Sequence, residues 1–149
     1  MPPSSSHDDD SDGAPLPEDL GGVAQLLGIE VQEAGPERVV ATMPVTSDHH
    51  QPFGVLHGGV SVVLAESAAS IGGHLATPPD RTAVGVEVNA NHVRPVRDGR
   101  LAATATSLHT GRTTQVWAVK IRDEADHLVC ASRCTLAVVE RTDDPPSAA

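Results

Sequence analysis

A turn that leads directly into a long apolar helix constrains this chain more than any other stretch. Pro52, Gly54 and the paired glycines at 58 and 59 punctuate the turn, and apolar residues then recur at helical spacing from Val60 onward. The other faces carry alanine, serine, glycine and histidine, so the helix predicted over residues 59–76 is apolar nearly all round. We therefore expect a buried helix whose small side chains let a sheet wrap closely around it.

Glu66 is the only full charge between Gly59 and Pro78. No lysine or arginine lies three or four residues away on the helix to pair with it. A single glutamate on a helix is ordinarily a solvated surface charge. In this apolar setting, however, the pattern favours a functional carboxylate held away from water.

The length of 149 residues and the placement of charge indicate one domain between polar tails. The net charge is −10, but nine of the twenty acidic residues lie within residues 1–22 and 140–149. An acidic chain without a basic stripe argues against a nucleic-acid partner. Residues 1–17 and 141–149 are predicted to be disordered, and residues 18–140 to form the single domain.

No apolar run reaches membrane-spanning length, and the N-terminus lacks the basic and apolar regions of a secretory signal. We expect a cytoplasmic protein without a membrane partner.

Cys130 and Cys134 should face the same way on one strand as reduced packing residues. His49 and His50 lie near His57 but lack an acid or cysteine at matching spacing, so no metal is expected.

The rest of the chain reads mainly as strands. A short helix near residues 20–29 is stopped by Gly28, residues 30–35 are ambiguous, and residues 38–45 form a first strand. After the long helix come four β-rich runs over residues 82–94, 100–109, 113–122 and 128–139. Their separators have the composition and length of hairpin turns, and the alternation of Val84 with Val86, and of Trp117 with Val119, predicts one buried face. The fold class is α+β, with an antiparallel sheet of five to six strands wrapped around the central helix.

Three motifs stand out along the chain. They are His-Gln-Pro-Phe-Gly-x-Leu-His-Gly-Gly-x₆-Glu over residues 50–66, Val-Glu-Val-Asn-Ala-Asn-His-Val-Arg-Pro over residues 86–95, and Leu-His-Thr-Gly-Arg over residues 108–112. Together they resemble the motifs of the hotdog-fold acyl-CoA thioesterases. The first motif is long and specific, and the similarity covers about residues 24–139. Within the superfamily, the chain resembles the phenylacetate-pathway type and its bacterial thioesterases for 1,4-dihydroxy-2-naphthoyl-CoA in menaquinone synthesis or for proofreading in enterobactin synthesis. The resemblance implies an acyl-CoA substrate, no cofactor, and a homodimer that usually doubles to a homotetramer.

The resemblance also implies roles for individual residues. Gly58 supplies a backbone N–H to the oxyanion with Gln51 as a helper and His57 as a positioner, while Glu66 is the base or nucleophile and Ser70 orients it or the water. Contacts to the acyl group or coenzyme A are implied for Gly85, His92, Val93, Arg94, His109, Gly111, Arg112 and Thr113.

Several of these assignments have competing interpretations. His92 is equally compatible with a hydrogen-bonded structural histidine. Arg94 and Arg97 also fit ordinary exposed arginines in turns, and that interpretation is favoured for Arg97. Arg112 stands where relatives often carry a different residue, which leaves its phosphate partner open.

The spacing of Gly58 and Glu66 leads to an independent inference. Eight residues of helix place them about 12 Å apart, so one chain cannot direct both at a single carbonyl. Two antiparallel helices related by a two-fold axis would bring the start of one beside Glu66 of the other, so we expect composite active sites in a homodimer. The alternative is a non-catalytic acyl-CoA-binding dimer on the same scaffold. A hotdog hydratase is disfavoured because its Asp/His pair is absent.

Overall fold

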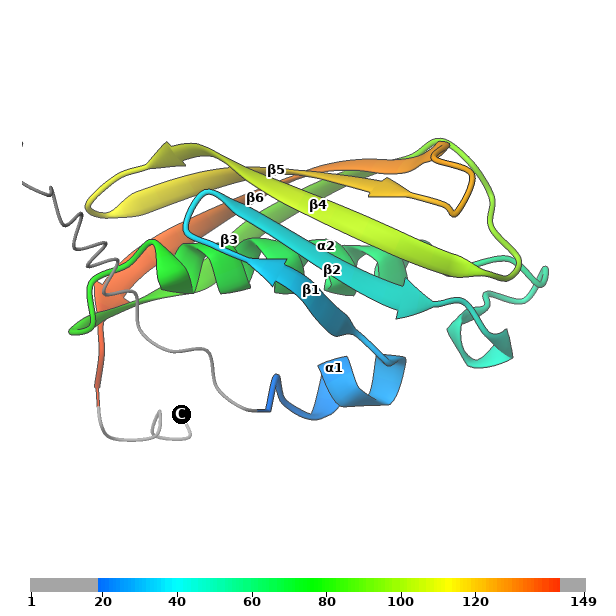
Figure 1. Cartoon of the computed structure of the whole chain (residues 1–149), viewed down its shortest axis with the longest axis horizontal. Coiled ribbons are helices and arrows are strands. Elements are labelled where there is room, and N and C mark those ends of the chain that lie inside the picture. Colours follow the sequence, from blue (N-terminus) through cyan, green and yellow to red (C-terminus); the bar gives the residue numbers. More distant parts are fainter. Residues whose placement is uncertain (1–18, 143–149) are drawn as a thin grey trace, which may run out of the picture.

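The computed structural model describes residues 19–142, which form a six-stranded antiparallel sheet curved over one long helix (Figure 1). The helical elements are α1 (Gly22–Leu27), the single turn η1 (Ser47–His49) and α2 (Gly58–Leu75). The strands are β1 (Glu30–Ala34), β2 (Arg38–Pro44), β3 (Arg81–His92), β4 (Arg100–Thr110), β5 (Thr114–Arg122) and β6 (Leu128–Glu140). Their order across the sheet is β1-β2-β4-β5-β6-β3, and α1 lies on the same side of the sheet as α2 (Figure 1). The predicted α+β fold class is confirmed.

Most predicted elements appear within one or two residues of their expected bounds. Gly28 ends α1 in the left-handed conformation, with φ 72°, as its position after the helix predicts. The ambiguous residues 30–35 form β1, which raises the sheet to six strands. The predicted disordered tail over residues 1–17 lies outside the described residues, as do residues 143–149 of the second tail.

The expected hairpin between the first two β-rich runs after the helix is wrong. β3 does not pair with β4 but lies at the edge of the sheet beside β6. Residues 93–99 therefore cross the end of the sheet, and the side chain of Val96 is buried on the way. The Val96 carbonyl accepts the Leu56 N–H at 2.7 Å, so this segment packs on the turn before α2 rather than closing a tight hairpin.

The core lies between the sheet and one face of α2. Leu64, Ala65 and Ala68 of α2 are fully buried, as are Trp117 and Val119 of β5, which confirms the alternation predicted for β5. A Cβ at position 72 would lie 2.5 Å from the Trp117 ring, so the glycine there lets the helix approach the sheet. Cys130 and Cys134 are buried on β6, where they pack as small residues.

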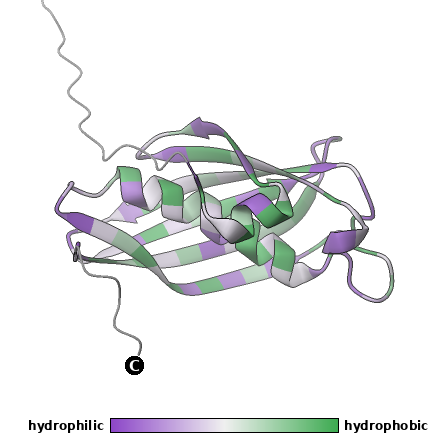
Figure 2. Ribbon diagram, turned by 90° about the horizontal axis from the view of Figure 1, so that it is seen from below, coloured by the Kyte–Doolittle hydropathy of each residue, from purple (hydrophilic) through white to green (hydrophobic). Residues whose placement is uncertain are grey.

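Two expectations about burial are wrong for the described chain. The helix is not enclosed on all sides, because the sheet covers one face and leaves Val63, Glu66 and Ser70 partly exposed. Figure 2 shows apolar and polar residues along α2 on its open side. On β3, Val84 and Val86 are 44% and 64% exposed, because β3 is an edge strand whose pairing shifts register between Gly85 and Glu87.

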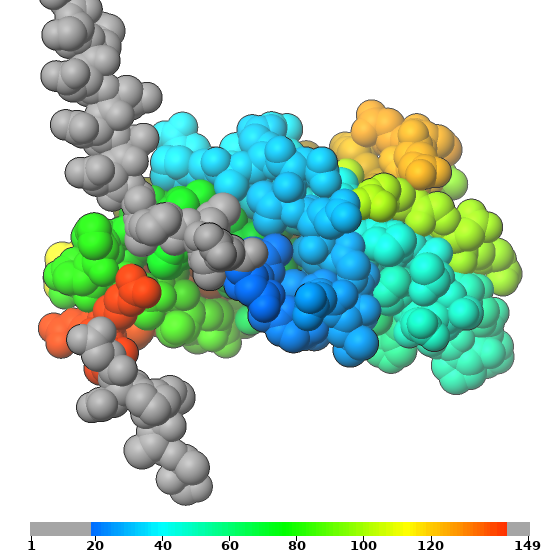
Figure 3. Space-filling model, turned by 60° about the horizontal axis from the view of Figure 1, so that its bottom comes forward, coloured from blue at the N-terminus to red at the C-terminus, as the bar shows by residue number. Residues whose placement is uncertain are grey.

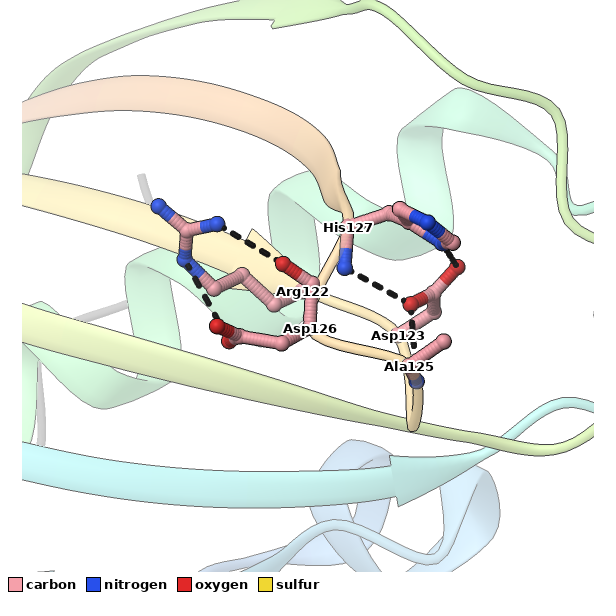
Figure 4. A network of polar contacts seen from close by, with 5 residues as sticks. All are labelled: Arg122, Asp123, Ala125, Asp126 and His127. Atoms are coloured by element: carbon pink, nitrogen blue, oxygen red, sulfur yellow. Dashed lines mark hydrogen bonds and ion pairs between the residues drawn. The ribbon is translucent and has the colours of Figure 1, made fainter.

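The turn from β5 to β6 is fixed by a local network of polar contacts (Figure 4). The Asp123 carboxylate accepts the backbone N–H of Ala125 at 3.0 Å and that of His127 at 2.9 Å. The hydrogen bond from the His127 backbone is the largest cause that lowers the pKa of Asp123 below its ordinary value. On the other side of the turn, Arg122 donates to the Asp126 carbonyl at 2.9 Å.

Candidate active site

The turn before α2 is closed by backbone hydrogen bonds. The Gln51 N–H donates to the Val55 carbonyl at 2.8 Å, and the Gly54 N–H donates to the Gln51 carbonyl at 3.0 Å. Gly54 has φ 77°, a conformation that a residue with a side chain rarely adopts. The turn therefore needs glycine at this position and delivers residues 55–57 to the helix start in one arrangement.

Two side chains of the turn are oriented by backbone N–H groups. The Gln51 side-chain oxygen accepts the Phe53 N–H, which leaves the amide nitrogen of Gln51 to donate elsewhere. The His57 ring caps the helix, with its Nδ1 accepting the Gly59 N–H at 2.9 Å. His57 is thus a capping residue, and Gln51 presents a donor.

The first N–H of α2 is uncommitted. Within residues 19–142, the hydrogen bonds include none donated by the Gly58 N–H, whereas the N–H groups of Gly59 and Val60 both bond to His57. The His92 ring lies against Gly58: its Nε2 is 3.1 Å from the Gly58 carbonyl oxygen, and a Cβ at position 58 would lie 2.9 Å from the ring. An open N–H at a helix start carries positive partial charge, so it can hold a developing oxyanion.

Glu66 lies on the open face of α2 and rests against β3. A Cβ at position 85 would lie 2.5 Å from its Oε1, so the bare backbone of Gly85 makes room for the carboxylate. Burial raises the pKa of the nearby Cys134 to about 11, and the negative charges of Glu66 and Glu87 add to this effect. The Cys134 thiol therefore stays protonated at neutral pH, which disfavours it as a nucleophile.

A cleft of about 630 Å³ opens between α1 and the open face of α2. Figure 3 shows this side of the molecule, with α1 in blue, α2 in green and the end of β6 in red. The lining residues are Leu20, Val23, Ala24, Val63, Glu66, Ser67, Ser70, Ile71, His74 and Arg141. Half of these residues are apolar, and Glu66 is the only carboxylate that residues 19–142 contribute, so the cleft can hold an apolar group beside this acid.

The structure gathers the predicted site residues into separate groups. Gln51, His57, Gly58 and His92 lie at the start of α2, and Val93 and Arg94 follow His92 there. Glu66, Ser70 and Gly85 lie farther along the helix.

The remaining four, His109, Gly111, Arg112 and Thr113, lie at the β4–β5 turn, at the opposite end of the sheet from His92 (Figure 1). There the Gly111 N–H donates to the Thr114 carbonyl at 2.9 Å, and a Cβ at Gly111 would meet the His109 ring at 2.6 Å. One chain therefore does not bring the predicted coenzyme A contacts together.

Several cleft residues were not anticipated. Sequence reasoning missed Ser67, His74 and Arg141, together with the α1 side of the cleft. For His74 a signal was present, because it lies one turn after Ser70 and two turns after Glu66. Nothing in the sequence spacing connects Leu20 or Arg141 with α2, since only the folded chain brings them there.

The histidines of the turn have structural partners. The His49 ring is buried, and its Nδ1 accepts the Thr46 N–H at 3.0 Å. Nε2 of His50 lies 2.7 Å from the Arg97 carbonyl oxygen. Between residues 19 and 142, no group of three or more histidine, cysteine or acidic side chains is arranged to hold a metal ion. Over the same residues, no helix is long and apolar enough to span a membrane.

Comparison with known proteins identifies the family. Residues 53–130 match the profile described as the thioesterase superfamily. The chain belongs to this superfamily. It is 48% identical over 120 residues to a 1,4-dihydroxy-2-naphthoyl-CoA hydrolase of Listeria monocytogenes. The matched residues make up 80% of this chain and 98% of that protein. The predicted hotdog thioesterase resemblance and the predicted class of thioester hydrolase are thereby confirmed.

Solved structures of thioesterase-superfamily proteins show the same fold. A thioesterase from Haemophilus influenzae superposes with a TM-score of 0.76 at 49% identity, over 79% of this chain and 82% of that one. Two structures of one Staphylococcus aureus protein superpose with TM-scores of 0.78 and 0.76 at 36% identity. They cover 80% and 78% of this chain and 100% and 97% of theirs. One carries alanine in place of a glutamate and the other in place of a glutamine, at the same spacing as Glu66 and Gln51 here.

Proposed function

We propose that this thioesterase hydrolyses aromatic acyl-CoA thioesters to the free acid and coenzyme A. The observation that carries the proposal is Glu66, the single carboxylate that the described part of the chain places in a half-apolar cleft large enough for a ring system. The named substrate of the Listeria relative is an aroyl-CoA, which supports the same class here.

The start of α2 supplies the oxyanion donors. Attack on the thioester carbonyl places negative charge on its oxygen, and a fixed N–H at a helix start stabilises that charge without reorganising. The Gly58 N–H is uncommitted within the described residues, whereas the next N–H of the helix, that of Gly59, is capped by His57. The free amide nitrogen of Gln51 adds a second donor.

Glu66 acts on the other side of the carbonyl. As a general base it takes a proton from water as the water oxygen attacks, and the proton then passes to the departing coenzyme A thiolate. As a nucleophile it attacks the thioester carbonyl and forms an anhydride as the C–S bond breaks and the coenzyme A thiolate leaves, and water then hydrolyses the anhydride to the free acid and the glutamate carboxylate. In both routes Ser70, one turn along α2 and in the same cleft, is placed to orient the carboxylate or the water.

The site is composite in this proposal, because one chain holds its two halves apart. His92 lies beside Gly58 and Gly85 beside Glu66, so α2 and β3 run side by side in opposite directions. A two-fold axis near Val62 would set Gly58 against Glu66 of the partner subunit and pair the two β3 edges. It would also bring the β4–β5 turn of one chain toward the end of β3 that holds His92 of the partner subunit. The predicted coenzyme A contacts, which lie apart in one chain, would then come from both chains to one site. The exposed Val84 and Val86 on β3 support such a partner.

A thiol-release assay tests the proposal, with benzoyl-, hydroxynaphthoyl-, phenylacetyl- and straight-chain CoA as substrates. We expect the aromatic thioesters to react fastest, and Glu66→Gln to lower kcat by about a thousandfold with an unchanged melting temperature. Glu87→Gln is the matched control, because it removes another carboxylate near Cys134 that lies outside the cleft. Near-normal hydrolysis by Glu66→Gln would contradict the proposal. Thermal stabilisation by acyl-CoA without any thiol release would instead indicate a binding dimer.

A further inference from the structure

The end of the cleft away from Glu66 is lined by two side-chain donors that have no partner in the described part of the chain. His74 lies eight residues after Glu66, about 12 Å along the helix, with Ser70 halfway between them. Arg141 lines the same cleft from the end of β6. Within residues 19–142, neither the His74 ring nor the Arg141 guanidinium forms a hydrogen bond or an ion pair. We call these two residues the distal pair.

The distal pair is held in place although its side chains are free. The Arg141 backbone N–H donates to the Asp80 carbonyl at 2.9 Å, which ties the residue to the start of β3. His74 belongs to the last turn of α2, where the Thr77 side chain donates to the Gly73 carbonyl at 2.6 Å and fixes the helix end. Among residues 19–142, no carboxylate other than Glu66 lines the cleft, so no described acid of the cleft competes for these donors.

We propose that the distal pair selects acyl groups that carry an accepting oxygen, as hydroxyl or carboxylate, at the edge remote from the thioester. This inference rests on the proposed thioesterase function and adds its substrate preference. With the carbonyl beside Glu66, a flat apolar ring system lies between the α1 side chains and those of Val63 and Ile71, and its far edge reaches His74. A site built to hydrogen-bond a polar group rejects an analogue that lacks the group, because its donors are then left unpaired on binding.

Matched thioesters test the preference. The probes are 2-naphthoyl, 6-hydroxy-2-naphthoyl and 6-carboxy-2-naphthoyl thioesters of N-acetylcysteamine, each compared with its coenzyme A counterpart. N-acetylcysteamine lacks the nucleotide, so a preference that persists with it comes from the acyl group and not from coenzyme A phosphates. We expect kcat/KM for the hydroxylated probe to exceed that for the plain probe by about tenfold with both carriers.

Substitutions assign the preference to the distal pair. His74→Leu should reduce the hydroxyl preference to less than about twofold, with kcat/KM for the plain probe rising because no donor is then left unpaired, while His74→Gln should retain most of the preference through its amide donor. Arg141→Met should abolish the preference for the carboxylated probe, and Arg141→Lys should keep it in part. Equal losses on plain and substituted probes would show a structural role and overturn the inference. So would a preference that appears only with coenzyme A.

A binding measurement separates this inference from the proposed function. 2-Naphthamide and 6-hydroxy-2-naphthamide occupy the acyl position without a bond to hydrolyse. If the native protein releases no thiol from any thioester but binds the hydroxylated amide about tenfold more tightly in a His74-dependent way, the proposed hydrolysis fails while the inference stands. If hydrolysis proceeds and the two amides bind equally, the inference fails alone.

Discussion

The two ends of α2 differ in how their polar groups are held. At the start of the helix, short-range hydrogen bonds fix the turn, His57 accepts the N–H groups of Gly59 and Val60, and His92 lies against Gly58. Along the second half, Glu66, Ser70 and His74 face a cleft, and their side chains form no hydrogen bonds within residues 19–142. One end thus offers rigid donors and the other offers an acid with freedom to react, and a working site needs both.

A substitution behind Glu66 tests the second half of the helix. Gly85→Ala would place a Cβ 2.5 Å from the Glu66 oxygen and so displace the carboxylate from its position against β3. We expect kcat to fall by about a hundredfold with little change in melting temperature, since β3 is an edge strand and the side chain can rotate into the cleft. Steady-state kinetics with an aroyl-CoA and thermal unfolding measure the two effects.

The control for this substitution is Gly22→Ala. Nothing lies within 4 Å of a Cβ at position 22, and this residue begins α1 rather than touching α2. Its activity should match that of the native enzyme. If Gly85→Ala is equally active, the carboxylate position does not depend on contact with β3.

The side of α2 that faces the sheet can be tested through the stability of the fold. Gly72→Ala would bring a Cβ to 2.5 Å from the Trp117 ring, which is fully buried and whose Nε1 donates to the Gln115 side chain at 2.9 Å. Overpacking at such a position costs about 1–3 kcal/mol, so the free energy of unfolding should fall by that amount. Urea unfolding measures it, and an unchanged midpoint would show that α2 is not packed tightly on β5.

The smallest expected effect lies outside α2, in the β5–β6 turn. The pKa of Asp123 is lowered below 3.8, so its contribution to the turn is present above that value and is lost as the pH falls through the lower folded value. The amide resonances of Ala125 and His127 should therefore shift together in an NMR titration, with a midpoint below 3.8. Asp123→Asn should abolish this shift. A midpoint at or above 3.8 would show that these hydrogen bonds do not hold the carboxylate.

Local patterns predicted the elements of this fold and their class. The apolar spacing from Val60, the stop at Gly28 and the alternation around Trp117 each depend on neighbours in the sequence, and each is found in the structure. Which strand pairs with which depends on distant contacts, and the place of β3 beside β6 was missed for that reason. An edge strand and an interior strand can share the same alternation of valines, so burial on β3 was also misjudged.

For the candidate site, the sequence predicted the residues of the turn and of α2, but not the cleft. Glu66 stands out because it is an isolated charge in an apolar helix. The partial exposure of Glu66 could not be predicted, since it follows from how far the sheet reaches around the helix. The α1 side chains and Arg141 join the cleft only through the tertiary fold.

Subunit complementation tests most directly the claim that the two halves of a site come from different chains. Gln51→Ala and Glu66→Ala proteins are each assayed alone and then after mixing under conditions that allow proven subunit exchange. If the sites are composite, both variants are weak alone, and random exchange restores about a quarter of the native activity, because half of the dimers are hybrids with one intact site of two. No recovery despite exchange would show that each site lies within one chain and would contradict the account.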